Sequence, residues 1–241
     1  MRKSPELQLK TRGHIRESDL CDFNNLGITE LLELLDSINA YERTIAVRLL
    51  SDLLRDDEQK AILLCTKLSG ENKLYTKIEL CDALAKMGIC AVNVMSRYLG
   101  RIGNNQYTEL PEEEFGKKSY PLPRDIISRT LSHMGKQVLP YLLEILVTKD
   151  ILAIREVIDA IGFICFYEHI DYPMSDLITC LNMNNDDILI RWKVTRALGS
   201  FNNDVAIVLL ISIQNSDPVE RIRKEAERSL RISQQRKTPF V

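Results

Sequence analysis

Apolar residues recur three and four positions apart over most of the chain, which is the spacing of a helix with one buried side. Near the C-terminus, Ile222, Ala226 and Leu230 fall on one side of such a helix, and an acidic residue and a proline stand at its start. The same template fits five earlier segments, 37–54, 71–88, 120–135, 150–162 and 185–199. Six copies at intervals of 30 to 47 residues predict one repeated helical element.

A further apolar helix precedes each of these copies. These first helices are expected at 28–35, 61–68, 91–99, 138–147, 174–181 and 205–213. Short polar connections, such as residues 182–187, join the two members of a pair, which is typical of antiparallel helical hairpins. The pattern therefore predicts an all-α fold of about six helical pairs.

The pattern resembles HEAT repeats, particularly the short variety called PBS-lyase HEAT-like repeats. The shared signature is an apolar first helix, an Asp-rich turn, and then aliphatic-Arg-x-x-Ala-x-x-Ala-Leu, and it covers residues 27–233. The family's basic position falls on Arg43, Lys77, Arg124, Arg191 and Arg223. The copy at 150–162 departs from it, because Ile154 occupies that position and Arg155 follows it. The resemblance implies a right-handed α-solenoid (α-α superhelix) of about six antiparallel helical hairpins, a fold used mostly for scaffolds.

This interpretation divides the chain into three parts. Residues 1–26 form a basic N-terminal arm or cap, 27–233 form the repeat solenoid, and 234–241 form a C-terminal tail. One interval between repeats is longer than the rest, because residues 101–123 are inserted there and are rich in Gly, Asn, Pro and charge. Either a partner-contacting loop or a solvated insertion fits this segment.

In this family the second helix of each pair lines the concave surface. The residue after the basic position, and the residue four further on, point away from the apolar side of that helix. They form two rows that we expect to be exposed. The first row reads Thr44, Ile78, Asp125, Arg155, Trp192 and Lys224. The second row reads Arg48, Asp82, Arg129, Asp159, Arg196 and Arg228.

Two hypotheses explain the second row. Its charges alternate through Arg48, Asp82 and Arg129, which fits a ladder of exposed ion pairs worth about 0–1 kcal/mol each. At its C-terminal end the alternation fails beside the one tryptophan, which fits a binding corner for a carboxylate, phosphate or peptide. That corner comprises Arg155, Asp159, Trp192, Arg196, Lys224 and Arg228. A tryptophan that merely fills a gap between repeats is the competing interpretation.

Composition narrows the function classes. With 45% apolar and 27% charged residues among 241, neither a fibre, a membrane bundle nor a disordered chain fits. The ten glycines and eight prolines are few, which disfavours turn-rich β architectures. A net charge of -2 gives no global attraction to nucleic acid or to an anionic membrane, although both ends of the chain are basic. No stretch suits a signal peptide or a membrane span.

Catalytic motifs are also missing from the sequence. The three histidines, His14, His133 and His169, fall in unrelated parts of the chain, and no His-Glu pair recurs in the repeats, so no metal or cofactor is expected. No Gly-rich phosphate loop or Gly-x-Ser-x-Gly elbow occurs. The six cysteines lack a C-x-x-C pair and mostly lie in apolar helices, which favours buried free thiols in the cytoplasm.

The sequence thus predicts a non-enzymatic scaffold that binds a protein or peptide, one of acidic character included, through its concave face. The enzyme alternative is a DNA glycosylase built on HEAT-like repeats, for which Asp159, Trp192 and Arg196 would supply acidic, aromatic and basic groups. The acidic middle of the chain opposes a groove that tracks phosphates. Phycobilin lyases share the repeat name, but no chromophore-specific feature is present.

Overall fold

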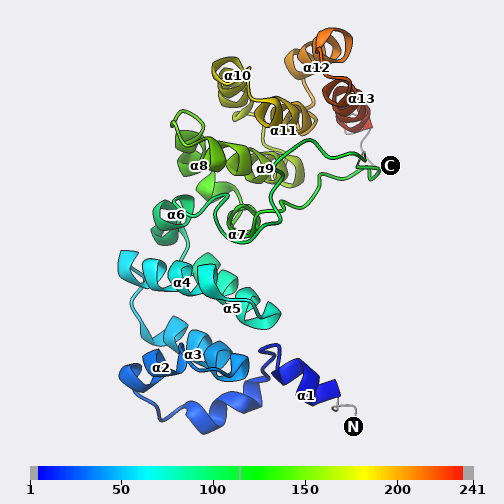
Figure 1. The fold of residues 1–241 in the computed structure, drawn as a ribbon. Helices are drawn as coiled ribbons and strands as arrows, with labels where there is room; N and C mark the ends of the chain where they lie inside the picture. The colour runs from blue at the N-terminus through cyan, green and yellow to red at the C-terminus, as the bar shows by residue number, and fades with distance from the viewer. Residues whose placement is uncertain (1–4, 114, 236–241) are drawn as a thin grey trace, which may run out of the picture. The chain divides into compact units, whose positions relative to one another are not determined.

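The computed structural model describes residues 5–113 and 115–235, and within them it contains helices and no strand. The predicted all-α class is therefore confirmed. The helices fall into two compact units, unit 1 (Met1–Met95) and unit 2 (Ser96–Val241). Figure 1 colours the helices of unit 1 from blue to blue-green and those of unit 2 from green to red.

Unit 1 consists of short N-terminal elements and two packed helical pairs. Its elements are α1 (Pro5–Lys10), the 3-10 helix η1 (Glu17–Phe23), α2 (Ile28–Leu34), α3 (Ala40–Leu53), α4 (Glu58–Gly70) and α5 (Leu74–Lys86), and α6 (Ile89–Ser96) ends at its boundary. Helix α2 packs on α3, α4 packs on α5, and the second helices α3 and α5 pack on each other. Leucines such as Leu50, Leu64 and Leu84 fill the space between these helices and are buried.

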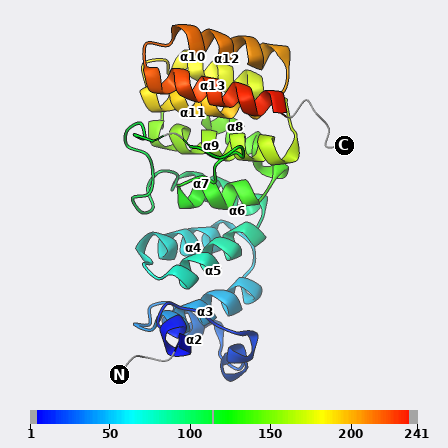
Figure 2. The ribbon, with the colours of Figure 1, turned by 90° about the vertical axis from the view of Figure 1, so that its right-hand side faces the viewer.

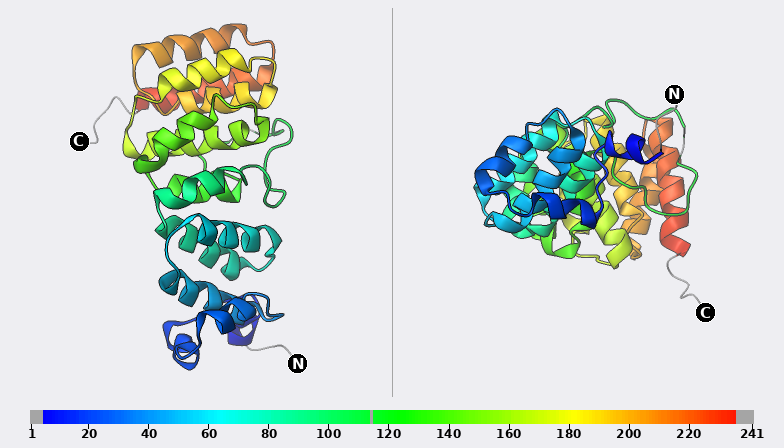
Figure 3. Two further views of the ribbon diagram at one scale, coloured as in Figure 1. Left: turned by 90° about the vertical axis from the view of Figure 1, so that its left-hand side faces the viewer. Right: turned by 90° about the horizontal axis from the view of Figure 1, so that it is seen from below.

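Unit 2 repeats this arrangement with more helices. Its elements are α7 (Ile126–His133), the 3-10 helix η2 (Lys136–Val138), α8 (Leu139–Ile145), α9 (Ile151–Glu168), α10 (Met174–Met183), α11 (Ile188–Leu198), α12 (Asp204–Ser216) and α13 (Glu220–Gln235). Helices α8, α10 and α12 pack on α9, α11 and α13 respectively, and the second helices pack in the order α7, α9, α11, α13. Figure 2 looks onto the second helices of this unit, and the left panel of Figure 3 looks onto its first helices.

Acidic and amide side chains start several of these helices, at the polar turns that the sequence indicates. Each accepts a hydrogen bond from a backbone amide in the first turn, which satisfies a donor that the helix leaves open. The capping residues are Asp57, Asp125, Asp150, Asp187 and Asn203. The contacts of Asp125, Asp150 and Asp187 fix where the second helices α7, α9 and α11 begin.

Two predicted second helices have different lengths in the structure. The helix expected from residue 120 begins at Ile126, because Pro121 and Pro123 favour extended backbone before it. The helix expected to end at Gly162 continues to Glu168, since the apolar residues that follow Gly162 keep packing. The basic arm of residues 1–26 contains α1 and η1, and of the predicted tail only Gln234 and Gln235 lie within the described residues, where they end α13.

Ion pairs join one second helix to the acidic start of the next. The Arg43 guanidinium donates two hydrogen bonds of 2.8 Å to the Glu71 carboxylate in unit 1. In unit 2, Arg155 Nη2 lies 2.6 Å from Asp187 Oδ2. The sequence places Ile154 at the basic position, but its neighbour Arg155 takes over the role. The expectation that Arg155 offers a free charge is therefore wrong.

Candidate functional site

A segment of the chain itself covers the second helices of unit 2. We call residues 101–113 and 115–123 the strap. Figures 1 and 2 show this green segment leaving α6, passing along the second helices to α13, and returning to α7. The described residues between 102 and 123 form no helix and no backbone–backbone hydrogen bond. The predicted insertion is thus an extended segment that side chains of the helices hold in place.

Arg228 on α13 makes the most numerous contacts with the strap. Its Nε donates to the carbonyl of Phe115 at 2.8 Å, and its Nη2 donates to the carbonyls of Lys117 and Ser119 at 3.2 and 2.9 Å. Its guanidinium also lies 5.0 Å from the centre of the Phe115 ring. Because every peptide carries carbonyl groups, three of these four contacts recognise an extended main chain rather than a particular side chain.

Other helices hold the strap in the same manner. Further side chains donate to its carbonyl oxygens: Arg221 to Glu112, Tyr167 to Tyr120, and Arg129 to Pro123. These donors come from α13, α9 and α7 respectively. The face of the second helices is therefore an array of donors that is filled by the carbonyls of one extended chain.

Trp192 lies beneath the strap. Its side chain is 1% exposed and packs with Leu189 and Ile222, against which Leu110 of the strap also packs. The ring of Tyr107 meets the indole edge-on, with the ring centres 5.0 Å apart. The prediction that Trp192 is an exposed anchor is wrong, because the strap occupies the space into which the indole was expected to point.

The arginines around Trp192 are paired within the face. The Arg196 guanidinium stacks 3.8 Å from the centre of the indole and lies 3.5 Å from the Glu225 carboxylate. Arg228 Nη1 donates to the same carboxylate at 2.8 Å. Burial alone would lower the pKa of Arg196, but the charges of Glu225 and Asp159, together with smaller contributions that include the hydrogen bond to Glu225, outweigh it and raise the pKa. The predicted union of tryptophan and arginine is present, although neither arginine is free for an external ligand.

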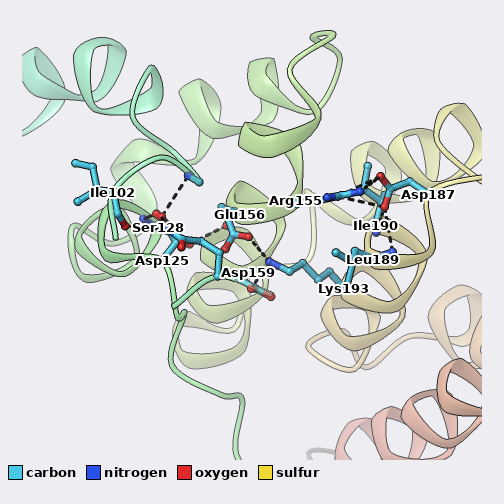
Figure 4. Close-up of polar contacts among 12 residues, drawn as sticks. Ile102, Asp125, Ser128, Arg155, Glu156, Asp159, Asp187, Leu189, Ile190 and Lys193 are labelled. Carbon is cyan, nitrogen blue, oxygen red and sulfur yellow. Dashed lines mark hydrogen bonds and ion pairs between the residues drawn. The ribbon is translucent and has the colours of Figure 1, made fainter. Parts of the chain in front are cut away.

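A buried lysine lies one turn from this cluster. Lys193 is 0% exposed, and its Nζ lies 2.8 Å from Glu156 Oε1 and 2.9 Å from Asp159 Oδ2, as Figure 4 shows. The other carboxylate oxygens, Glu156 Oε2 and Asp159 Oδ1, are buried without a hydrogen-bond partner. Burial, with the nearby charge of Asp159, raises the pKa of Glu156 to about 7 against the opposing charge of Lys193. Two carboxylates therefore share one ammonium group.

Asp125 connects the base of the strap to α7. Its carboxylate accepts hydrogen bonds from Ser128 N at 2.7 Å, Gly100 N at 3.2 Å and Gln106 Nε2 at 2.8 Å. Burial raises its pKa in spite of these hydrogen bonds. Its expected place in an exposed row is wrong, because a helix-capping carboxylate turns back onto the backbone.

Tyr120 fixes the end of the strap before α7. Its side chain is 4% exposed and lies against Gly162, where an added Cβ would be 2.1 Å from the tyrosine Oη. The hydroxyl is buried without a hydrogen-bond partner, and burial raises its pKa well above the ordinary value. The absence of a side chain at Gly162 therefore provides the recess that holds this ring.

No model of a known protein family matches the chain, and a search of curated proteins finds no similar sequence. In the part of the chain that the structure describes, no three His, Cys, Asp or Glu side chains are grouped to hold a metal ion. Over the same residues, no helix combines the length and the apolar character that crossing a membrane requires. The face of the second helices of unit 2, beneath the strap, is the candidate functional site.

Two arginines of the predicted charge ladder have partners outside it. Arg48 binds Glu79 on α5 and Glu17 of η1. Arg129 belongs to unit 2 and donates to a strap carbonyl, while Asp82 lies exposed in unit 1. The alternation of charge in the sequence therefore does not identify these partners of the two arginines.

The first predicted row mixes buried and exposed positions. Thr44 joins Asp125 and Trp192 among the buried residues, whereas Ile78 and Lys224 are exposed. Lys224 Nζ lies 2.9 Å from Glu220 Oε1, one turn earlier on α13. The row was expected to be exposed because helical periodicity identifies the side turned from the apolar core, but it cannot show what else covers that side.

The second helices of unit 1 also carry a cover. The carbonyl of Arg12 accepts a hydrogen bond of 3.1 Å from Tyr75 N at the start of α5, and His14 meets the Tyr75 ring edge-on. Gly13 has a φ of +88°, and an added Cβ would lie 2.4 Å from Thr76 Oγ1. The predicted basic arm is thus a packed segment in this region.

A pocket of about 530 Å³ opens elsewhere in unit 1, among α2, α3, α4 and the start of α5. Two of the cations that line it are paired, Arg43 with Glu71 and Lys67 with Asp36. No aromatic ring is among the lining residues, and Arg43 also donates to the carbonyls of Ser37 and Ile38 in the connection before its own helix. The pocket is therefore a weaker candidate than the face beneath the strap.

The cysteines differ in their surroundings. All six are free thiols, of which Cys65, Cys165 and Cys180 are buried as the sequence predicts. Cys21 and Cys90 are exposed, so the prediction is wrong for them. Burial raises the pKa of Cys65 to about 12 and that of Cys180 to about 11. These two thiols are therefore poor nucleophiles.

Proposed function

We propose that the chain is a right-handed α-solenoid of HEAT-like repeats and a non-enzymatic scaffold that binds a protein or peptide through the face of its second helices. The packing of α3 on α5, and of α7, α9, α11 and α13 in succession, supports the repeat interpretation within each unit. Stacked helical repeats present such faces to extended partners. In this proposal the buried charged residues of the face, such as Arg228, serve to bind the partner.

The contacts of Arg228 carry the proposal. A single buried guanidinium that donates to the carbonyls of three strap residues is a receptor for extended main chain. Charge-assisted hydrogen bonds are about twice as strong as neutral ones. Side chains of the partner would be selected beside it, in the place that Tyr107 occupies against Trp192.

The glycosylase alternative has less support. Asp159, Trp192 and Arg196 do lie in one region, but Asp159 is bound to Lys193 and Arg196 is bound to Glu225. All three side chains are buried beneath the strap. A base excised from nucleic acid would need an open pocket there and a free carboxylate, and the arrangement offers neither.

The proposal is tested with a chain in which residues 102–122 are replaced by a Gly/Ser linker of equal length. A labelled synthetic peptide of residues 105–119 is then added in trans. We expect binding with a Kd of about 1–10 μM, equivalent to roughly 7–8 kcal/mol. Emission from Trp192, the one tryptophan of the chain, should change as the Tyr107 ring of the peptide arrives. Circular dichroism checks that the variant is helical.

A matched pair of arginines on α13 serves as the control. Arg228→Gln in the linker chain should weaken peptide binding at least tenfold, because the guanidinium that donates to the peptide's carbonyls is lost. Arg231→Gln makes the same change at an exposed residue that pairs with Glu227 on its own helix, and should leave the affinity unchanged. If the folded linker chain fails to bind the peptide up to ~1 mM, the proposed function is wrong.

A further inference from the structure

We propose that the strap is an internal competitor for the binding face, and that an acidic, extended segment of another protein with an aromatic side chain displaces it. This inference rests on the proposed function. It adds that the intact chain is closed, and it specifies the chemistry of the partner. Three observations support it.

The first observation is the charge beneath the strap. Arg196, Glu225 and Arg228 form one buried group, and Asp159 and Lys193 form another beside it. Desolvating paired charges costs about as much as their attraction returns, so apolar residues would serve a permanent cover at least as well. Charged groups that meet water when the strap leaves are instead suited to a face that opens.

The second observation is that the strap fits imperfectly. The Tyr120 hydroxyl is buried without a hydrogen-bond partner. A buried polar group left unpaired costs about 1–3 kcal/mol. Because the strap also lacks backbone–backbone hydrogen bonds over its described residues from 102 to 123, removing it breaks no secondary structure.

The third observation identifies the partner chemistry. Tyr107 lies against Trp192 and also accepts the Arg124 guanidinium on its ring, 4.4 Å from its centre. Leu110 packs three residues later, and the acidic residues Glu112 and Glu113 follow. Both carboxylates are exposed, and Arg221 donates to the backbone carbonyl of Glu112. Its helix α13 carries five basic residues against three acidic ones, which favours negative charge in this part of a bound segment. A partner that replaces the strap therefore needs an aromatic residue, an aliphatic one and then negative charge.

The attachment of the strap to its own chain determines how strongly it competes with a free peptide for the face. A segment joined to its own binding face by a short connection has an effective concentration of about 1 mM. If the free peptide binds the open face with a Kd near 1–10 μM, the intact chain should bind it about 100 to 1,000 times more weakly. A variant that loosens the strap must recover part of that factor.

Gly162→Ala loosens the strap without changing its sequence. The new methyl group would meet the Tyr120 ring, with 2.5 Å to its Cζ, and the ring must leave its recess. The labelled peptide of residues 105–119 lacks Tyr120, so this clash does not affect the peptide itself. We expect full-length Gly162→Ala to bind the peptide at least tenfold more tightly than the unmodified chain, as measured by fluorescence anisotropy.

Two other full-length variants bracket this result. Tyr120→Phe removes the unpartnered hydroxyl, which should tighten the strap and weaken peptide binding severalfold. Gly70→Ala adds the same methyl group at a helical position with open space in unit 1, and should match the unmodified chain.

Changes in the peptide test the partner chemistry. Peptides with Tyr107→Ala, or with Glu109, Glu112 and Glu113 changed to Gln, should bind at least tenfold more weakly if the partner chemistry is right.

The outcomes separate this inference from the proposed function. If the linker chain binds the peptide but Gly162→Ala binds no better than the unmodified chain, the strap is not a competitor although the face still binds peptide. If the peptide with the three Glu→Gln changes binds as well as the unchanged peptide, the acidic partner is wrong. If binding variants dimerise in sedimentation experiments by exchanging straps, the occupant is a second copy of this chain, which would overturn the proposal of another protein.

Discussion

Both units cover the face of their second helices with a segment of their own chain, but they place the glycine that permits close contact on opposite sides. In unit 1, Gly13 belongs to the covering segment and lies against Thr76 of α5. In unit 2, Gly162 belongs to α9 and receives Tyr120 of the strap. The first cover depends on its own backbone conformation, whereas the second depends on a recess in the helix that a side chain enters.

The groups beneath the two covers differ as well. Under Gly13, the hydroxyls of Thr44 and Thr76 share a hydrogen bond of 2.8 Å, which is a neutral contact. In unit 2, Lys193 balances two buried carboxylates, and Arg228 holds the main chain of the strap. The cover of unit 1 has the character of a permanent closure, and that of unit 2 has the character of a bound ligand.

The largest expected difference between the units comes from Lys193→Met. The change leaves Glu156 and Asp159 buried without a counter-ion, which should cost about 3–5 kcal/mol. Thr76→Val in unit 1 removes the neutral hydrogen bonds of its hydroxyl to Thr44 and to the Ala40 carbonyl, and should cost about 1 kcal/mol. Urea titration followed by circular dichroism and by Trp192 emission measures both. Equal losses in the two variants would contradict the contrast between a charged and a neutral interior.

A pH titration examines the same contrast. The pKa of Glu156 is about 7 in the folded chain and near 4.5 in an unfolded one, so the folded state holds the proton more tightly. The stability that this proton provides is complete below pH 4.5 and is lost as the pH rises through about 7. Unfolding free energies measured from pH 5 to pH 8 should fall by up to about 3 kcal/mol.

Glu156→Gln should remove most of that slope, because the amide resembles the protonated acid and cannot ionise. Lys193 then retains Asp159 as its partner at 2.9 Å. The variant should be the more stable of the two chains at pH 8. A slope that persists unchanged in Glu156→Gln would assign the titration to another group, with Asp125 the next buried carboxyl of raised pKa.

The sequence predicts the helices of this chain well because the signals for them are local. Apolar spacing locates the first and second helices, and the acidic turns become caps such as Asp57 and Asp187. The errors in helix length come from packing beyond the template, as where α9 continues past Gly162. The HEAT-like resemblance and the solenoid remain proposals.

The sequence predicts only part of the candidate site. Periodicity correctly brings Trp192 and Arg196 together, because one turn of α11 separates them. It could not predict the strap's path, since Phe115 and Arg228 are 113 residues apart and meet through contacts that have no local signal. The burial of Lys193 has no local signal either. A lysine in a helix is expected in water, and only the carboxylates of α9 explain its burial.

Gly13→Ala examines the cover of unit 1 and should cost less than the loss of Lys193. The alanine must adopt the left-handed φ of +88° and clear Thr76 Oγ1 at 2.4 Å, for a combined cost of about 2 kcal/mol. Gly88→Ala is the matched control, because its φ is +61° and open space surrounds it, so it isolates the backbone cost of about 1 kcal/mol. The readout is hydrogen exchange of the Tyr75 amide, which is bonded to the carbonyl of Arg12. Exchange there should quicken by roughly 30-fold in Gly13→Ala and stay nearly unchanged in Gly88→Ala. If both variants leave the Tyr75 amide protected, the N-terminal segment does not close the face as the Gly13 contact implies, and the asymmetry between the two covers disappears.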